Sequence, residues 1–304
     1  MKYIKIAKEL DASAIALGCM RIAGKNEKEV DAIIDKALEK GINFFDHANI
    51  YGGGQSERVF GEYLKRHPEA RDKMIIQSKF GIRPGMYDFS KDHILESVDG
   101  ILSRLGLEKI DLLVLHRPDT LMEPLEVAEA FDILESQGKV ERFGVSNHNL
   151  WQIELLKTCV KQPLVVDQLQ FSVTEAGMVT SGMNVNMKNS ESVMHDGGLL
   201  EYCRIKGITV QAWSPFQYGF FGGSFIGSDK YPELNKKLSE LAQKYCVTPT
   251  AIAAAWILRH PANIQLISGS MTVSRIEEVC SGADITLEKS EWYDIYRAAG
   301  HCLP

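Results

Sequence analysis

Short apolar runs alternate along the chain with longer segments whose apolar residues recur at helical spacing. Segments 30–38, 94–105 and 127–134 show the helical pattern most clearly, with apolar residues at i, i+3, i+4 and i+7. The apolar runs are shorter, which is typical of buried strands. Eight runs have this character: Ile15–Gly18, Asn43–Asp46, Met74–Lys79, Leu112–His116, Phe143–Asn147, Val165–Gln170, Ile208–Trp213 and Ile264–Ser268.

Strict alternation of strand and helix predicts parallel strands joined by right-handed crossovers. Several helical segments are followed by a glycine just before the next run, at Gly41, Gly138 and Gly207, as is common at helix C-termini. Eight such units close into a barrel more readily than they extend an open sheet. We therefore expect an α/β protein with one (β/α)8 TIM barrel domain over residues 1–304. An N-terminal β segment would cap the bottom of the barrel, with long loops at its C-terminal face.

Two connections are longer than a barrel requires. Ser172–Gly198 is rich in Ser, Gly, Met and Asn, and Pro215–Ser228 is rich in Gly and Phe. Because long loops of this kind usually serve function, we expect Ser172–Gly198 to lie over the mouth of the active site. Together with Met20, Tyr87 and Phe216–Phe225 it would form an apolar and aromatic rim, which suits a hydrophobic or aromatic substrate.

The composition of the chain argues against some classes of binding partner. A formal net charge of -6 gives no general attraction to nucleic acid or to an anionic membrane. No stretch reaches the roughly 18 apolar residues of a membrane helix, and the first residues lack the apolar run of a signal peptide. We expect a cytoplasmic protein that acts on a small molecule, binds no metal, nucleic acid or membrane, and is a monomer or a weak homo-oligomer. The scattered cysteines show no zinc-ligand spacing and suit free thiols: Cys19, Cys159, Cys203, Cys246, Cys280 and Cys302.

Polar residues fall at the ends of the apolar runs. Asp46, Lys79 and His116 each end such a run, and Asn147 and Gln168 end or nearly end two more. In a barrel the C-terminal strand ends gather on one face, so these side chains should meet in one pocket. Taken singly, each also has an ordinary explanation as a loop carboxylate, a surface lysine or a core histidine. Together they favour a site in which Lys79 and Asp46 pair, because burying either charge alone is costly.

Tyr51 lies five residues after Asp46, in a loop that can fold back over this pocket. A nearby ammonium stabilises the tyrosinate form, so we expect Lys79 to lower the pKa of Tyr51 from about 10. Tyr51 would then serve as a general acid. An aromatic side chain that merely covers a loop is the alternative.

The stretch Phe45-Asp-His-Ala-Asn-Ile-Tyr51-Gly resembles the aldo-keto reductase signature, in which an aspartate precedes a tyrosine by five residues. Three later stretches resemble the family in the same order: 76–79 the lysine strand, 111–119 the histidine strand, and 138–147 the segment that holds the nicotinamide carboxamide. The Asp-His-Ala-Asx-Ile-Tyr-Gly form is closer to bacterial reductases of the family than to the vertebrate aldose reductase branch.

The resemblance implies an NADP-dependent oxidoreductase that uses NADPH to reduce an aldehyde or ketone to the alcohol. Tyr51 would donate the proton, Lys79 and Asp46 would tune it, and His116 would orient the carbonyl. Trp213 matches a ring that stacks on the nicotinamide, with a core aromatic as its alternative. The cofactor contacts implied are Gly18, Cys19, Met20, Arg21, Asp46, Ser146, Asn147, Gln168, Trp213, Ser214, Pro215, Phe216, Ser268, Gly269, Ser270, Arg275 and Glu278.

The far end of the cofactor would bind after the eighth run, where a helix begins. Thr272 or Ser274 would supply its N-cap, and the free N–H groups of its first turn would face an anion. Arg275 matches the family's 2′-phosphate ligand, which favours NADPH over NADH. Some branches have a lysine at the position of Gly269, so discrimination would depend mainly on Arg275. Glu278 matches an adenine contact.

Two other functions are compatible with parts of this pattern. A barrel with Asp and His at its strand ends also suits a metal-dependent hydrolase, but the early strands lack a His-x-His pair and Lys79 occupies a position where a ligand would be useful. The family resemblance also allows an NADPH-binding regulatory or redox-sensing protein with slow turnover.

Overall fold

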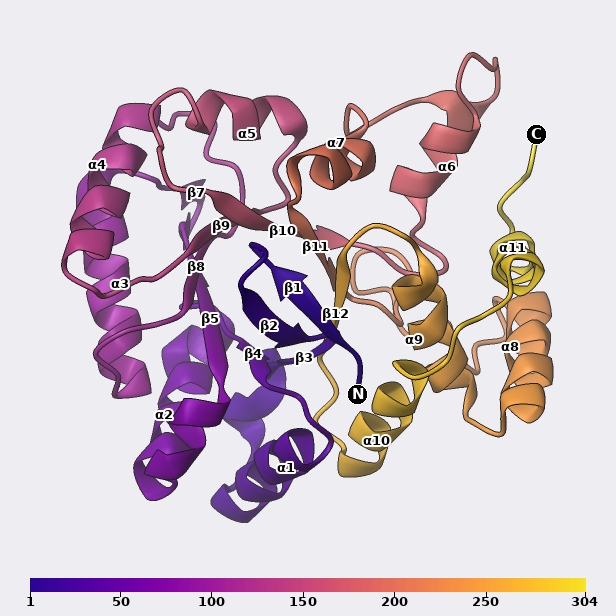
Figure 1. The fold of residues 1–304 in the computed structure, drawn as a ribbon, viewed down its shortest axis with the longest axis horizontal. Helices are drawn as coiled ribbons and strands as arrows, with labels where there is room; N and C mark the ends of the chain where they lie inside the picture. The colour runs from indigo at the N-terminus through magenta and orange to yellow at the C-terminus, as the bar shows by residue number, and fades with distance from the viewer.

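Eight parallel strands form a closed barrel at the centre of the computed structural model, which describes residues 1–304 (Figure 1). Around the barrel the order is β10-β11-β12-β3-β4-β5-β8-β9, and the ring closes between β9 and β10. Each predicted run matches one strand to within a residue at either end, which confirms the predicted barrel. The strands are β3 (Ile15–Gly18), β4 (Phe44–Asp46), β5 (Ile75–Phe80), β8 (Leu112–Leu115), β9 (Phe143–Ser146), β10 (Leu164–Gln170), β11 (Thr209–Trp213) and β12 (Ile264–Ser268).

Helices surround the barrel on its outer side (Figure 1). The three predicted helical segments lie within α1, α3 and α4, and the glycines expected at helix ends, Gly41, Gly138 and Gly207, have the positive φ of such positions, 81°, 68° and 70°. The α-helices are α1 (Glu27–Glu39), α2 (Gln55–Arg66), α3 (Lys91–Leu105), α4 (Pro124–Ser136), α5 (Leu150–Leu156), α6 (Gly177–Met183), α7 (Leu199–Lys206), α8 (Pro232–Tyr245), α9 (Pro249–Arg259), α10 (Val273–Gly282) and α11 (Lys289–Ala298). Short 3-10 helices are η1 (Cys19–Gly24), η2 (Tyr51–Gly54), η3 (Pro68–Lys73) and η4 (Ser190–Ser192).

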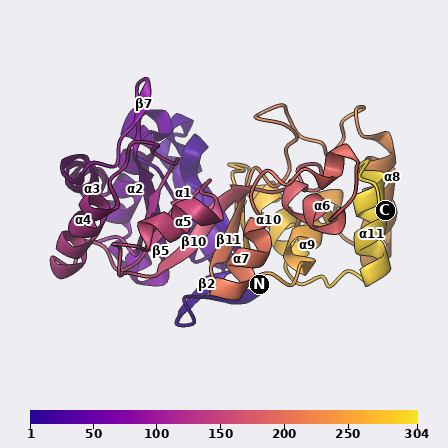
Figure 2. The same cartoon turned by 90° about the horizontal axis from the view of Figure 1, so that it is seen from above.

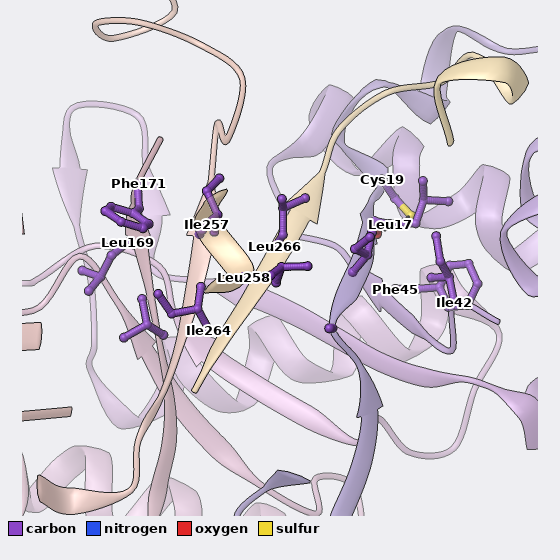
Figure 3. Close-up of a cluster of buried hydrophobic side chains, with 14 of the residues drawn as sticks. Leu17, Cys19, Ile42, Phe45, Leu169, Phe171, Ile257, Leu258, Ile264 and Leu266 are labelled. Atoms are coloured by element: carbon purple, nitrogen blue, oxygen red, sulfur yellow. Dashed lines mark hydrogen bonds between the residues drawn. The ribbon is translucent and has the colours of Figure 1, made fainter. Parts of the chain in front are cut away.

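The main core lies between the outer face of the barrel and these helices. Leu17, Phe45 and Leu266 alternate with inward-facing neighbours on their strands and join a large buried cluster that includes Ile257 of α9 (Figure 3). Such alternation leaves every second strand residue pointing into the barrel. The residues that carry chemistry belong to this inward set.

An antiparallel hairpin closes the bottom of the barrel, as predicted. Its strands are β1 (Tyr3–Ile6) and β2 (Leu10–Ser13), and Ile6 packs into an apolar cluster inside the barrel with Phe44 and Leu112. Figure 2 shows this hairpin on the side opposite the second hairpin, β6 (Ile82–Arg83) and β7 (Met86–Tyr87), which follows β5 at the other end. The site is therefore open at one end only.

The prediction that Ser172–Gly198 lies over the active-site mouth is wrong. The segment contains α6 and η4, and none of its residues lines the main cavity. It is held to the C-terminal part of the chain instead: Tyr296 Oη bonds Thr180 Oγ1 at 3.0 Å, and the His301 ring lies 2.8 Å from the Val173 carbonyl oxygen. Buried contacts of this kind leave no periodic signal in a short polar segment.

None of the helices combines the length and the apolar character that crossing a bilayer requires. Nowhere do three or more His, Cys, Asp or Glu side chains converge as metal ligands would.

Candidate active site

A cavity of about 790 Å³ opens at the C-terminal ends of the barrel strands. Most of the predicted site residues line it: Gly18, Met20, Arg21, Asp46, Tyr51, His116, Ser146, Asn147, Gln168, Trp213, Ser214, Pro215, Phe216, Gly269, Ser270 and Arg275. Lys79 lies beneath the lining, fully buried. Cys19 and Ser268 are buried away from the cavity surface, and Glu278 is half-buried on α10 outside the lining. Part of the predicted rim also lines the cavity, including Met20, Tyr87, Phe216, Phe220 and Phe221.

Three adjacent strands supply the candidate catalytic residues. Asp46 ends β4, Lys79 lies near the end of β5, and His116 follows β8. Because β4, β5 and β8 are consecutive around the barrel, their inward-facing ends lie side by side. Residues that are far apart in the sequence are therefore neighbours in the fold.

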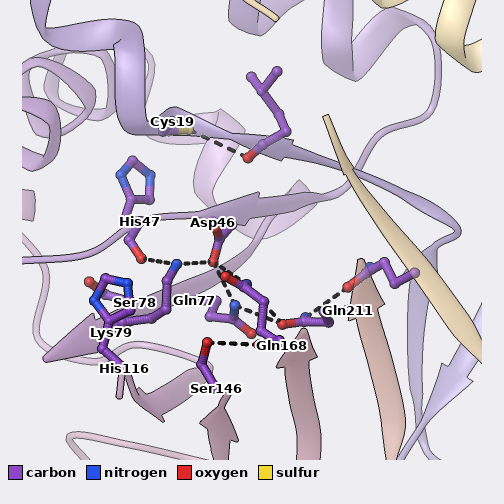
Figure 4. A network of polar contacts seen from close by, with 12 residues as sticks. Cys19, Asp46, His47, Gln77, Ser78, Lys79, His116, Ser146, Gln168 and Gln211 are labelled. Atoms are coloured by element: carbon purple, nitrogen blue, oxygen red, sulfur yellow. Dashed lines mark hydrogen bonds and ion pairs between the residues drawn. The ribbon is translucent and has the colours of Figure 1, made fainter. Parts of the chain in front are cut away.

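Lys79 and Asp46 form a buried ion pair at the floor of the cavity. The Lys79 ammonium lies 2.6 Å from Asp46 Oδ1 and donates to the His47 carbonyl oxygen at 2.7 Å (Figure 4). Burial acts to lower the pKa of Lys79, but Asp46 and Tyr51 act against it and the pKa is raised overall. Lys79 therefore carries its charge, and the predicted pairing is confirmed.

Tyr51 reaches this pair from η2, which folds back over the strand ends. Gly52 and Gly53 allow the sharp turn, since their φ values of 57° and 64° are strained for other residues. The Lys79 ammonium lies 5.0 Å from the centroid of the Tyr51 ring, and the His116 ring meets Tyr51 edge-on with centroids 6.1 Å apart. Tyr51, Lys79 and His116 therefore form one cluster.

The expected lowering of the Tyr51 pKa is wrong. Burial raises the pKa of Tyr51, and the opposing effect of the Lys79 ammonium is smaller. The prediction counted the ammonium but not the desolvation, which depends on depth in the fold. Tyr51 is consequently protonated at neutral pH, the form that a proton donor requires.

His116 is neutral at the same pH. Burial, and then the positive charges of Lys79 and Arg117, hold the pKa of His116 well below its usual range. Its Nδ1 is buried without a hydrogen-bond partner. A neutral imidazole beside Tyr51 can donate one hydrogen bond to a bound oxygen without adding a charge.

A second hydrogen-bonded group lies on β9, β10 and β11. Ser146 Oγ donates to the Gln168 carbonyl oxygen at 2.8 Å, Asn147 Nδ2 donates to Ser146 Oγ at 2.8 Å, and Trp213 Nε1 donates to Asn147 Oδ1 at 3.1 Å. Asn147 has a positive φ of 58°. The four residues predicted to hold the nicotinamide are thus brought together.

Sequence reasoning missed a chain of glutamines inside the barrel (Figure 4). Gln77 Nε2 donates to Asp46 Oδ1 at 2.6 Å and to Gln211 Oε1 at 3.0 Å. Gln211 Nε2 donates to Gln265 Oε1 at 2.8 Å, and Gln265 Nε2 donates to the Ser13 carbonyl oxygen at 2.8 Å. The signal was present as a spacing of two, since Gln77 precedes Lys79, and Gln211 precedes Trp213, by two residues within their strands.

The opposite part of the cavity carries the positive charges expected for a phosphate. Arg21 Nη1 donates to the Gly269 carbonyl oxygen at 3.2 Å, and Arg275 lies in the first turn of α10. Thr272 is the N-cap residue of α10, as one of the two predicted alternatives, but its hydroxyl makes no capping bond. The N–H groups of the first turn therefore lack a side-chain cap and can face an anion.

Comparisons with known proteins place the chain in a family and match its fold. The model of the aldo/keto reductase family matches residues 14–299. The chain is 32% identical over 312 aligned residues to a 6-dehydroglucose reductase of Agrobacterium fabrum (strain C58), with 98% of each chain covered. It resembles the solved thermostable aldo-keto reductase Tm1743, described in complex with the inhibitor epalrestat, with a TM-score of 0.79, 25% identity and coverage of 98% and 100%. An aldo-keto reductase of Klebsiella pneumoniae, solved with NADPH, shares the fold with a TM-score of 0.79 at 21% identity, with coverage of 97% and 94%.

Proposed function

Since the chain belongs to the aldo/keto reductase family, we propose that it reduces an aldehyde or ketone to the corresponding alcohol with NADPH, Tyr51 serving as the general acid. The observation that carries the proposal is the buried Lys79–Asp46 pair beside a protonated Tyr51 and a neutral His116. This set provides one proton donor and one neutral hydrogen-bond donor at a single point of the cavity.

Each side chain has a task in this reaction. The Tyr51 hydroxyl protonates the carbonyl oxygen as negative charge develops on it, and His116 holds that oxygen by a hydrogen bond. Lys79 stabilises the tyrosinate that remains after the proton leaves. Asp46 keeps Lys79 charged and in place through the 2.6 Å contact. Positioning and electrostatic stabilisation then supply most of the rate enhancement.

The residues present suit NADPH as the cofactor, which when bound supplies the hydride for the carbonyl carbon. Ser146 and Asn147 offer hydroxyl and amide groups for a carboxamide. Gln168 offers its Oε1, since its Nε2 donates to Asp46 Oδ1 and Gln211 Oε1. The Trp213 indole offers a flat surface for a ring. At the other end Arg275 offers a guanidinium for the 2′-phosphate. Gly18 is required by the packing of β3 against β12, because an added Cβ would lie 2.9 Å from Ile267 Cγ2.

The test is the Tyr51→Phe variant, assayed with NADPH on a panel of aldehydes and ketones. The panel includes 6-dehydroglucose because the Agrobacterium relative is named for it. We expect turnover to fall by about 10² to 10⁴, the usual effect of removing a general acid, while NADPH binding measured by fluorescence is retained. Tyr293→Phe, on α11 and outside the lining of the cavity, is the control. Full activity of Tyr51→Phe would overturn the assignment. Binding of NADPH without turnover by the wild type would favour the regulatory alternative.

A further inference from the structure

The cavity is lined by three arginines and by a single carboxylate. Arg21, Arg117 and Arg275 are among the lining residues, while Asp46 is the only acidic one. Asp46 already pairs with Lys79. The cavity thus has unpaired positive charge in a chain whose formal net charge is -6.

Two of the arginines lie in the part of the cavity, beside the start of α10, that suits the cofactor phosphate. Arg21 bonds the Gly269 carbonyl oxygen just after β12, and Arg275 lies in α10, which also follows β12. Arg117 follows β8, which is four strands from β12 in either direction around the eight-stranded ring. The backbone of Arg117 therefore lies on the opposite side of the mouth from α10, and its side chain reaches across toward Trp213 at the end of β11, where the nicotinamide end of the cofactor is proposed to bind.

Arg117 has no anionic partner within the chain. It forms no ion pair and no hydrogen bond with another residue, and its guanidinium lies 5.8 Å from the centroid of the Trp213 ring. The nearby Asp119 is occupied by other donors, since its two oxygens accept from the backbone N–H groups of Phe89 and Leu121 at 2.9 Å each. Arg117 is half-buried, so part of its hydration has been lost without replacement.

Arg117 is close to the proposed reaction centre. It directly follows His116, and its charge contributes to the lowered pKa of that histidine. The cavity wall includes the apolar and aromatic residues Ile82, Tyr87 and Phe220, and the Phe220 ring meets Trp213 edge-on with centroids 6.4 Å apart. A neutral polyhydroxylated substrate would need acidic or amide acceptors for its hydroxyls. The only carboxylate of the lining, Asp46, pairs with Lys79. The amide oxygens of Asn147 and Gln217 already accept from Trp213 Nε1 and Ser214 Oγ. A planar guanidinium over an aromatic ring instead suits a carboxylate, which it can bind through two parallel hydrogen bonds.

We propose that the carbonyl substrate carries an anionic group, a carboxylate in the simplest case, and that Arg117 binds it. This inference rests on the proposed reductase function and names the class of its substrate. Arg117 thereby selects for charge at the end of the substrate remote from the reacting carbonyl, and the aromatic wall packs against the part between them.

The test compares 4-formylbenzoate with its methyl ester, two aldehydes of similar shape that differ in charge. The ester is intrinsically the more electrophilic aldehyde, so a preference for the acid cannot come from reactivity. We expect kcat/KM of the wild type with NADPH to favour the acid by about tenfold or more, as for one charge-assisted hydrogen-bonded pair. Arg117→Leu should lower kcat/KM for the acid by about 10- to 100-fold, mainly through KM, with less than about threefold change for the ester. Arg117→Lys should recover part of the loss.

The ester also separates this inference from the proposed function. Equal loss for acid and ester in Arg117→Leu would overturn the inference, because Arg117 would then act only through His116. An equally large loss for neutral glyceraldehyde would overturn it in favour of a polyhydroxylated substrate. Should the wild type reduce neither of these aldehydes nor any carbonyl of the panel, the proposed function fails. The anion site is then tested by the binding of unreactive terephthalate, followed by tryptophan fluorescence. If terephthalate binds the wild type but not Arg117→Leu, the anion site is supported. If terephthalate does not bind the wild type, the inference is overturned.

Discussion

The Lys79 ammonium lies 2.6 Å from Asp46 Oδ1, and the two side chains are 0% and 3% exposed. A buried pair of this kind contributes little net stability, because removing both charges from water costs about as much as their attraction returns. Its value lies in fixing a positive charge 5.0 Å from the Tyr51 ring centroid. Breaking the pair should therefore affect proton transfer in a direction that can be stated.

The first prediction concerns Lys79→Met. Lys79 lowers the pKa of Tyr51 and Asp46 raises it, so removing the ammonium leaves an unopposed carboxylate and raises the pKa further. Alcohol oxidation requires the tyrosinate, so its pH profile should move to higher pH. The rate at neutral pH should fall by about 10² or more.

The measurement for Lys79→Met is kcat/KM for alcohol oxidation with NADP between pH 6 and 11. Lys73→Met, at an exposed lysine, is the matched control and should leave the profile unchanged. A profile displaced toward lower pH would contradict the role given to Lys79.

The second prediction concerns Arg275→Gln. The guanidinium at the start of α10 would pair with the 2′-phosphate, which NADH lacks. The Kd for NADPH should rise by about 10- to 100-fold, while that for NADH changes little. Fluorescence titration with both nucleotides measures this, with Arg58→Gln on the exposed face of α2 as the control. An equal loss for both nucleotides would show that Arg275 does not read the 2′-phosphate.

The third prediction concerns His47 and acid stability. Burial, assisted by Lys79, lowers the pKa of His47 to about 3, against about 6.5 in an unfolded chain. Between these values the unfolded state binds the proton and the folded state does not, so stability falls as the pH falls. At pH 5 this group alone costs about 2 kcal/mol relative to pH 7 and above.

Replacing His47 by leucine should remove that part of the pH dependence. Neither ring nitrogen has a hydrogen-bond partner, so no bond is lost. Urea denaturation of the wild type and the variant at pH 7 and pH 5 gives the difference directly. His195→Leu, at an exposed position, is the control. Identical acid sensitivity of wild type and His47→Leu would show that His47 is not the group responsible.

The fourth prediction concerns Gly61→Ala in α2. Alanine normally stabilises a helix interior by about 1 kcal/mol relative to glycine. Here an added Cβ would lie 2.6 Å and 2.8 Å from the carbonyl oxygens of Arg104 and Leu105, so backbone must move. We expect a net destabilisation of about 1–3 kcal/mol by chemical denaturation. Gly177→Ala in α6 meets nothing within 4 Å and should be neutral or slightly stabilising. A stabilised Gly61→Ala would mean that α2 and α3 pack less closely than described.

The sequence predicted the barrel well because each inner strand is apolar and each connection is helical, a pattern that few folds share. Asp46, Lys79 and His116 were recognisable because a charged residue that ends an apolar run is costly unless it serves a site. The inner glutamines were overlooked because Gln77 and Gln211 fall within the runs, where only their spacing of two from Lys79 and Trp213 marks them as inward-facing.

Two errors have a different origin. The depth at which Tyr51 is buried depends on the whole barrel mouth, so the direction of its pKa could not be obtained from its neighbours in sequence. The placement of Ser172–Gly198 depends on contacts such as that between Thr180 and Tyr296, which are 116 residues apart. No local pattern encodes such a pairing.

The position of β8 opposite β12 also has a consequence for how this protein can change. Arg117 and Arg275 stand on opposite halves of the mouth and share no partner, and effects of such separated sites usually add. On the roles proposed for these two arginines, we therefore expect nucleotide preference and substrate preference to be separate heritable traits, so that a lineage or a protein engineer can alter either one while the other persists.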